Sequence, residues 1–273
     1  MNVPEFVAKE LLREAGIRTP QGSIARDGES AADIARKLGG RVAIKAQVPA
    51  GGRGKSGGIA FAGSPEAARE KAAELIGMAI AGHRVASVLV ETAADIEHEL
   101  YVAILNDGAT RAPLVLFSND GGVDIEQQSG KIVRRAIDVR SGLSAETAFE
   151  ITGDAQIAAV LQRMYERFIA LDCELLEINP LARDRTGAVV ALDCKMTIDD
   201  SSRPRQQALF ERVAAVAGPQ GMPIEQRARD AGLYYIELDG EIGILANGAG
   251  LTMTTLDAVA MRGGRPANFL EIG

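Results

Sequence analysis

The sequence is poor in the residues that serve most metal, redox and base-stacking sites. Its 273 residues include no tryptophan, only two histidines and two cysteines, and 4% aromatic residues. Two cysteines without metal-ligand neighbours argue against a zinc site. Scarce aromatics argue against a surface that stacks the bases of single strands, and a net charge of −7 argues against nonspecific nucleic-acid binding. We therefore expect no nucleic-acid partner.

Long apolar runs and targeting signals are also missing. No stretch approaches the roughly 18 uninterrupted apolar residues that a membrane span needs. The amino terminus lacks a basic segment followed by an apolar run, so no secretory signal is visible. These absences predict no membrane association, a cytoplasmic location, and reduced thiols at Cys173 and Cys194.

Residues 41–55 combine an apolar strand with a loop rich in glycine and cations. The strand carries Lys45 and runs directly into Gly-Gly-Arg-Gly-Lys at 51–55. Glycines let backbone N–H groups approach phosphate oxygens closely, and the cations offset the phosphate charge. The segment predicts a polyphosphate site, although a basic surface turn would have the same composition.

Oxygen-bearing side chains recur in the segment 174–194. Alternation along a strand places Glu177 and Asn179 on one face, about 7 Å apart. If the hairpin is centred near Arg185, Asp193 lies directly across from Glu177, whereas a shift of one residue would turn it to the other face. Two carboxylates and an amide oxygen suit Mg²⁺ when phosphates and water complete its shell. The pattern predicts a magnesium site; a polar, solvent-facing sheet surface is the alternative.

A third segment, Val88–Glu91, is an apolar strand that ends in an acid and is followed by further acids at 95–99. Backbone groups at such an edge could read adenine, and the carboxylate could take ribose hydroxyls. A solvated acidic loop would show the same pattern.

Periodicity and capping residues predict alternating helices and strands. Ser30 and Asp33 fit a capping box for a helix over about 31–38, and Ser64 with Pro65 fits the start of the next helix. From residue 233 the pattern predicts two apolar strands, a helix and a last strand at 267–271. A lone strand–helix–strand unit cannot bury both faces of its strands, so we expect the chain to end just inside a second α/β domain. The other expected helices cover about 4–15, 144–151 and 155–171, and the other strands about 22–26, 41–48, 58–62, 86–91, 98–106, 112–118, 173–179 and 188–194.

Four segments, taken in order, resemble one enzyme family. They are Ala50–Lys55, Glu177–Leu181, Ala246–Leu251 and Pro266–Leu270. The chain resembles the β subunit of ADP-forming succinyl-CoA synthetase and of its relative malate–CoA ligase over its whole length. The resemblance implies an α/β (α+β) protein with an ATP-grasp domain over 1–232, including a small lid subdomain at about 21–95, and the first βαβ unit of an incomplete flavodoxin-like CoA-ligase domain over 233–273.

The resemblance also implies a nucleotide site. Lys45 and the loop residues Gly52, Arg53 and Gly54 would hold the phosphates of ATP. The proline at position 20, Pro20, resembles the residue of the ATP-using members of the family, so GTP is the less expected nucleotide.

Further residues take roles from the same resemblance. Glu91, Ala94 (through its backbone) and Glu99 would contact the nucleotide, while Asn179 and Asp193 would bind Mg²⁺.

The implied mechanism is phosphoryl transfer through a histidine of a partner α subunit, which also carries the CoA site. ATP would phosphorylate that histidine, the phosphate would pass to a small dicarboxylic acid, and CoA would displace it to give the thioester. Glu177 would face the phosphohistidine, and Asn247 would lie near the acid. The chain's own His83 and His98 are expected to be surface residues. The intact enzyme would be a hetero-oligomer, and the fragment alone would bind nucleotide without completing the reaction.

Three alternatives stay open. The first is a stand-alone ATP-grasp carboxylate ligase, against which the turn at 247–250 argues because it begins an additional domain. The second, a dinucleotide-binding oxidoreductase built on that turn, lacks the acid expected about 20 positions on after a complete second strand. The third is a noncatalytic nucleotide-binding module.

The chain departs from the family pattern after Asp200. The family has a run close to Asp-Asp-Asn-Ala-Leu-Phe-Arg, where this chain continues from Asp200 as Ser-Ser-Arg-Pro-Arg.

Overall fold

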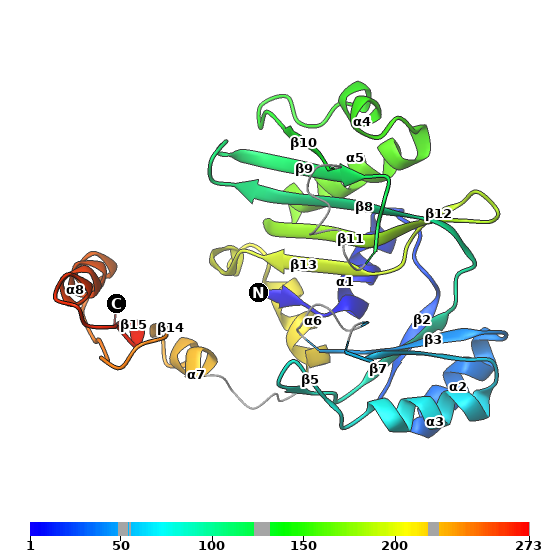
Figure 1. Cartoon of the computed structure of the whole chain (residues 1–273), viewed down its shortest axis with the longest axis horizontal. Coiled ribbons are helices and arrows are strands. Elements are labelled where there is room, and N and C mark those ends of the chain that lie inside the picture. The colour runs from blue at the N-terminus through cyan, green and yellow to red at the C-terminus, as the bar shows by residue number, and fades with distance from the viewer. Residues whose placement is uncertain (49–53, 55, 123–131, 218–223, 273) are drawn as a thin grey trace. The chain divides into compact units, whose positions relative to one another are not determined.

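The computed structural model describes residues 1–48, 54, 56–122, 132–217 and 224–272. The chain divides into two compact units, Met1–Val216 and Ala217–Gly273 (Figure 1). Within the described ranges, no helix has the length and apolar character needed to cross a membrane.

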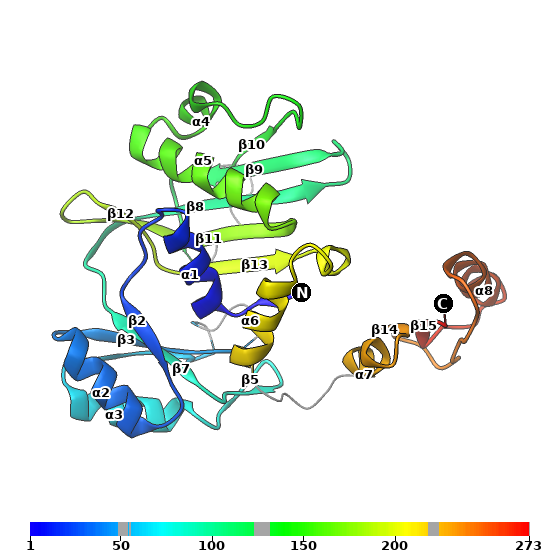
Figure 2. The same cartoon turned by 180° about the vertical axis from the view of Figure 1, so that it is seen from behind.

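The first unit contains a large antiparallel sheet of seven strands. Helices α1 (Glu5–Glu14), α5 (Ala155–Ala170) and α6 (Gln207–Ala217) lie on one face of this sheet (Figure 2). Their apolar side chains, with those of α4 (Ala145–Thr152), join the sheet in the main hydrophobic core. The strands, in spatial order, are β1 (Asn2–Val3), β13 (Cys194–Ile198), β11 (Cys173–Asp184), β8 (Ile96–Asp107), β9 (Ala112–Ser118) and β10 (Val133–Ala136), and β12 (Val189–Ala191) pairs with β11.

A smaller antiparallel sheet of four strands belongs to the same unit. Helices α2 (Gly28–Leu38) and α3 (Pro65–Leu75) cover one of its faces and share a second hydrophobic core with it. The strands, in spatial order, are β2 (Gly22–Ala25), β7 (Val88–Thr92), β3 (Val42–Ala46) and β4 (Ile59–Ala62). Two short strands, β5 (Ala79–Ile80) and β6 (His83–Arg84), pair separately.

Capping side chains determine where the helices begin. Ser64 accepts a hydrogen bond from Ala67 N and Pro65 opens α3, which confirms the predicted start. The capping box predicted for Ser30 and Asp33 is wrong. Asp27, in an extended conformation, is the N-cap of α2. Its side chain accepts a hydrogen bond from Ser30 N and its backbone N–H donates one to Ser30 Oγ, so the helix begins three residues earlier than predicted.

The second unit is a small α/β assembly of α7 (Ile224–Asp230), β14 (Tyr234–Glu237), α8 (Ala249–Met261) and β15 (Asn268–Glu271). β14 and β15 pair antiparallel. The segment after β14 runs parallel to the segment of β15, through isolated bridges at Ile242 and Ala246. Between them the Asn268 side chain bonds both the N–H and the C=O of Ile244, while Ile242 and Ala246 on either side keep backbone hydrogen bonds to the 265–272 segment.

Candidate functional site

Lys45 projects from the face of the small sheet that α2 and α3 leave uncovered. Its neighbours Val42 and Ile44 pack into the core under those helices, and alternation along β3 turns Lys45 to the opposite side. Glu91 on β7 shares that side, since Lys45 pairs with Leu89 and Glu91 lies two residues further along. Both side chains are buried, with 7% of Lys45 and 2% of Glu91 exposed.

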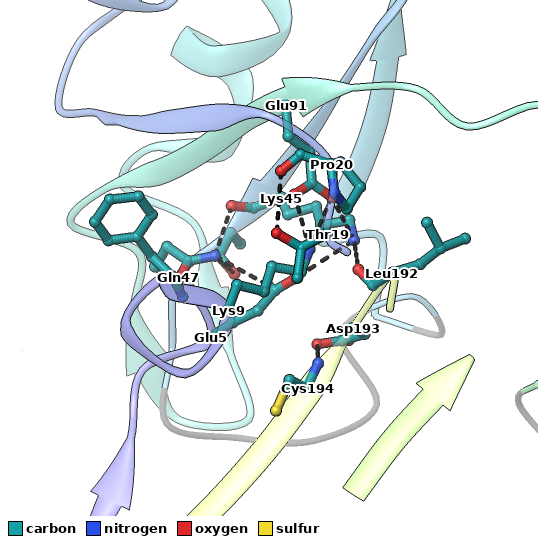
Figure 3. Close-up of polar contacts among 12 residues, drawn as sticks. Glu5, Lys9, Thr19, Pro20, Lys45, Gln47, Glu91, Leu192, Asp193 and Cys194 are labelled. Atoms are coloured by element: carbon teal, nitrogen blue, oxygen red, sulfur yellow. Dashed lines mark hydrogen bonds and ion pairs between the residues drawn. The ribbon is translucent and has the colours of Figure 1, made fainter. Parts of the chain in front are cut away.

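Helix α1 completes a buried cluster of four charges around Lys45 (Figure 3). While Val7 and Leu11 enter the main core, Glu5 and Lys9 are directed at the small sheet. Lys9 Nζ lies 2.8 Å from Glu5 Oε1 and 2.7 Å from Glu91 Oε2. Lys45 Nζ lies 2.8 Å from Glu91 Oε1 and 3.4 Å from Glu5 Oε1, so two ammonium groups alternate with two carboxylates.

A backbone carbonyl links this cluster to the large sheet. Lys45 Nζ donates a 2.6 Å hydrogen bond to Leu192 O, next to Asp193. Burial by itself would lower the pKa of Lys45, but the negative charges of Glu5, Glu91 and Asp193 outweigh it and raise that pKa. Lys45 is therefore a permanently charged ammonium, the state needed to hold an anionic phosphate.

The sheet face that carries Glu177 and Asn179 lies away from the main core. Leu176 and Ile178 are fully buried in that core, so Glu177 and Asn179 alternate to the other side of β11. The predicted register is wrong by two residues, because Glu177 lies opposite Lys195 rather than Asp193.

The register shift keeps the two expected magnesium ligands near each other. Ile178 pairs with Cys194, so Asn179 directly follows one member of that pair and Asp193 directly precedes the other. The hairpin is longer than expected because β11 continues to Asp184 and the return strand is interrupted between β12 and β13. The peptide bond between Asn179 and Pro180 is cis.

Asn179 also holds the loop that follows β9. Its Oδ1 accepts a 2.9 Å hydrogen bond from Gly122 N, and its Nδ2 donates one of 3.2 Å to Gly122 O. Glu99 borders the same loop, since a Cβ on Gly122 would lie 2.9 Å from Glu99 Oε2. Gly122 has a φ of +103°, so both its backbone conformation and its close neighbour favour glycine. Asn179 and Glu99 therefore meet at one loop.

The donor chemistry of Asn179 and Asp193 suits Mg²⁺. An amide oxygen that accepts one hydrogen bond keeps a second lone pair, and Asp193 Oδ1 accepts a bond from Cys194 N. In the described part of the chain no three His, Cys, Asp or Glu side chains gather as a metal cluster. A site with one carboxylate and one amide oxygen fits a hard cation that draws further ligands from substrate phosphates and water.

Ala94 borders an open cavity of about 400 Å³ in the first unit. Pro20 and Thr92 line the same cavity, together with the guanidinium-bearing side chains of Arg13 and Arg18. The predicted nucleotide residue Ala94 and the residue expected to reflect nucleotide choice, Pro20, thus share one cavity.

The remaining predicted residues lie elsewhere. Gly52 and Arg53 fall outside the described residues, whereas Gly54 is described and exposed. Asn247 is exposed in the second unit, directly before Gly248, the N-cap of α8.

The histidines and cysteines take no part in these clusters. His83 and His98 are exposed, as expected. Cys173 and Cys194 are buried free thiols, and burial raises the pKa of Cys173 to about 12.

Sequence reasoning missed Glu5 and Lys9. Opposite charges four residues apart on an amphipathic helix usually form an ordinary surface pair. Glu5 and Lys9 are both buried positions of α1. Their burial becomes evident only from the tertiary structure, in which Lys9 contacts Glu91 on β7.

Comparison with known proteins identifies the class to which this fold and site belong. Residues 2–183 match the ATP-grasp domain family. The chain is 48% identical over 292 aligned residues to "Succinate--CoA ligase [ADP-forming] subunit beta" of Rubrobacter xylanophilus, covering all of this chain and 74% of the relative. It is 41% identical to "Succinate--CoA ligase [GDP-forming] subunit beta" of Thermus thermophilus, again covering all of this chain and 74% of the relative. The chain belongs to the ATP-grasp family of succinate–CoA ligase β subunits, as its motifs predicted.

Solved structures support the fold. ATP citrate lyase from Methanothrix soehngenii, in complex with citrate and coenzyme A, matches with a TM-score of 0.72 at 21% identity, over 99% of this chain and 71% of that chain. Acetyl-coenzyme A synthetase 1 from Ca. Korarchaeum cryptofilum matches with a TM-score of 0.59 at 19% identity, over 72% of this chain and 93% of that chain. The expected α/β fold with an ATP-grasp domain is confirmed.

Proposed function

We propose that the chain is the nucleotide- and Mg²⁺-binding β subunit of an ADP-forming acyl-CoA ligase. The overall reaction joins succinate or malate to CoA at the expense of ATP, through a phosphohistidine on an α subunit. The single observation that carries the nucleotide role is Lys45, a charged ammonium held on the inner face of the small sheet beside the segment that bears Asp193.

Lys45 would bind and orient the nucleotide phosphates by charge-assisted hydrogen bonds. Asn179 and Asp193 would hold Mg²⁺, which supplies positive charge to the same phosphates. Glu91, Ala94 and Glu99 would contact the rest of the nucleotide, and the loop Gly52, Arg53 and Gly54 would cover its phosphates. Ala94 borders the cavity and Glu99 borders the Gly122 loop, which supports this division of roles.

The partner-facing roles belong to Glu177 and Asn247. Glu177 is half-buried on the face of β11 that is turned away from the main core, and there it would meet a histidine delivered by an α subunit. Asn247 would meet the dicarboxylic acid from the second unit, which we propose begins the CoA-ligase domain. The first unit then corresponds to the ATP-grasp domain, with the small sheet and its helices as the lid.

ATP is the proposed nucleotide. The relative from Rubrobacter xylanophilus carries the ADP-forming name, and Pro20 lines the cavity beside Ala94. The GDP-forming relative from Thermus thermophilus makes GTP the natural competitor in a binding test.

Calorimetric titration of ATP with and without Mg²⁺ tests the nucleotide role. We expect Lys45→Met to weaken binding at least about tenfold, because a charge-assisted hydrogen bond is lost. Asp193→Asn keeps an oxygen for Cys194 N but should abolish the effect of Mg²⁺ on affinity. Lys37→Met, on the exposed side of α2, serves as the matched control and should leave affinity unchanged.

The outcomes separate the competing functions. No ATP binding by the parent protein, or unchanged binding in both variants, would refute the proposal. Binding that never supports thioester formation with a matching α subunit, CoA and either succinate or malate would favour the noncatalytic module. Thioester formation without any α subunit would favour a stand-alone ligase.

A further inference from the structure

The donors of Lys45 are fully used within the protein. An ammonium group has three N–H donors. Lys45 Nζ has three acceptors within 3.5 Å: Glu91 Oε1 at 2.8 Å, Leu192 O at 2.6 Å and Glu5 Oε1 at 3.4 Å. A phosphate oxygen that binds Lys45 must therefore displace at least one of them.

Displacement would be costly if Lys45 were the only cation near these carboxylates. Glu5 and Glu91 are both almost fully buried, and a buried carboxylate without a cation has lost its hydration with no opposite charge to offset the loss. Gln47 Nε2 also donates to Glu5 Oε2 at 3.2 Å, but an amide supplies no net charge.

Lys9 contacts both carboxylates independently of Lys45. Its Nζ lies 2.8 Å from Glu5 Oε1, and 2.9 Å and 2.7 Å from the two oxygens of Glu91. Only 1% of its side chain is exposed. No phosphate could replace these contacts without opening the interface between α1 and β7.

We propose that Lys9 is a positioning residue that keeps Glu5 and Glu91 paired while Lys45 turns from them to the nucleotide phosphate. This inference rests on the proposed function, because it takes Lys45 as the phosphate ligand. Lys9 does not touch the nucleotide; it lowers the cost of releasing Lys45. Glu5 has the opposite effect, since it helps to retain Lys45 within the protein.

The charge count predicts opposite effects from two neighbouring substitutions. Lys9→Met leaves Lys45 as the one described cation on Glu91, so ATP should bind roughly tenfold more weakly. Glu5→Gln leaves two ammonium groups on Glu91, so an incoming phosphate is favoured and ATP should bind several-fold more tightly. The double variant Lys9→Met/Glu5→Gln restores one cation per carboxylate and should return to within about threefold of the parent.

A proton count gives a readout that a purely structural role would not change. Among the described residues, Lys9 from α1 and Lys45 from β3 face Glu5 and Glu91, and Asp193 acts on Lys45 from the segment before β13. In Lys9→Met, withdrawal of Lys45 leaves Glu91 without either of its ammonium partners, and this carboxylate should take up a proton as ATP binds. Calorimetry in two buffers of different ionisation enthalpy should therefore show more proton uptake than in the parent, and the excess should vanish in the double variant.

The titrations of the full chain with Mg²⁺ and ATP decide the matter. Weaker binding with excess proton uptake in Lys9→Met, and tighter binding in Glu5→Gln, support the inference. Binding by the parent, with both single variants unchanged or both weaker, overturns the inference but leaves the proposed function standing. Absence of binding by the parent overturns both. If Lys9→Met does not fold, Glu5→Gln and the charge-balanced double variant decide by the same signs.

Discussion

Charged side chains lie in two different environments: the buried cluster around Lys45, and the face of β11 that carries Glu177 and Asn179. In the cluster, Glu5, Lys9, Lys45 and Glu91 are enclosed between α1 and the small sheet, and each ammonium contacts two carboxylates. On the face of β11 that is turned away from the main core, Glu177 is half-buried opposite the exposed Lys195. Charged side chains of the same types therefore contribute large interaction energies where water is excluded and small ones where it is not.

The largest effect on stability is expected when the cluster loses a carboxylate. Glu91→Ala removes the carboxylate that Lys9 and Lys45 both contact, so the free energy of unfolding should fall by about 3 kcal/mol. Chemical denaturation would measure this. Glu97→Ala, on the exposed part of β8, is the control and should change the unfolding free energy by less than about 0.5 kcal/mol. A loss below about 1 kcal/mol at Glu91 would remove the energetic distinction between the two regions.

An intermediate effect on stability is expected at Gly122, in the loop that Asn179 of β11 holds. Gly122→Ala places a Cβ 2.9 Å from Glu99 Oε2 at a φ of +103°, so it should cost about 1–2 kcal/mol of stability. It should also disturb the hydrogen bonds between Gly122 and Asn179.

Gly153→Ala, at the C-terminal end of α4, is the control that separates backbone strain from steric crowding in Gly122→Ala. Gly153 has a φ of +66° but no atom within 4 Å of an added Cβ, so only the conformational cost applies. Thermal unfolding of both variants should show the larger loss at Gly122. Equal losses would mean that Glu99 gives way without cost.

The smallest effect on stability is expected at Glu177. Glu177→Gln should change the unfolding free energy by less than about 1 kcal/mol, because Glu177 is only half-buried and lies across from an exposed lysine. With a matching α subunit, thioester formation should nevertheless fall at least about a hundredfold if this carboxylate assists the transfer of the phosphate. Normal turnover would remove Glu177 from the proposed mechanism.

Much of the fold could be predicted because it is encoded locally. Ser64 with Pro65 marked the start of α3, and alternation placed Glu177 and Asn179 on one side of β11. The start of α2 was misplaced because Asp27, Ser30 and Asp33 all carry side chains that can cap a helix. Local sequence alone does not rank such competing caps.

The sequence by itself determined the family, most secondary structure and the side of β11 on which the oxygen ligands lie, since motifs, capping residues and period-two alternation act over a few neighbouring residues. Tertiary structure decided the hairpin register, which depends on how far β11 extends before the turn. It also decided that Glu5 and Lys9 are buried beside Lys45. That result could not be read from a helix with charges four residues apart, because whether such a pair meets water or another sheet depends on long-range packing.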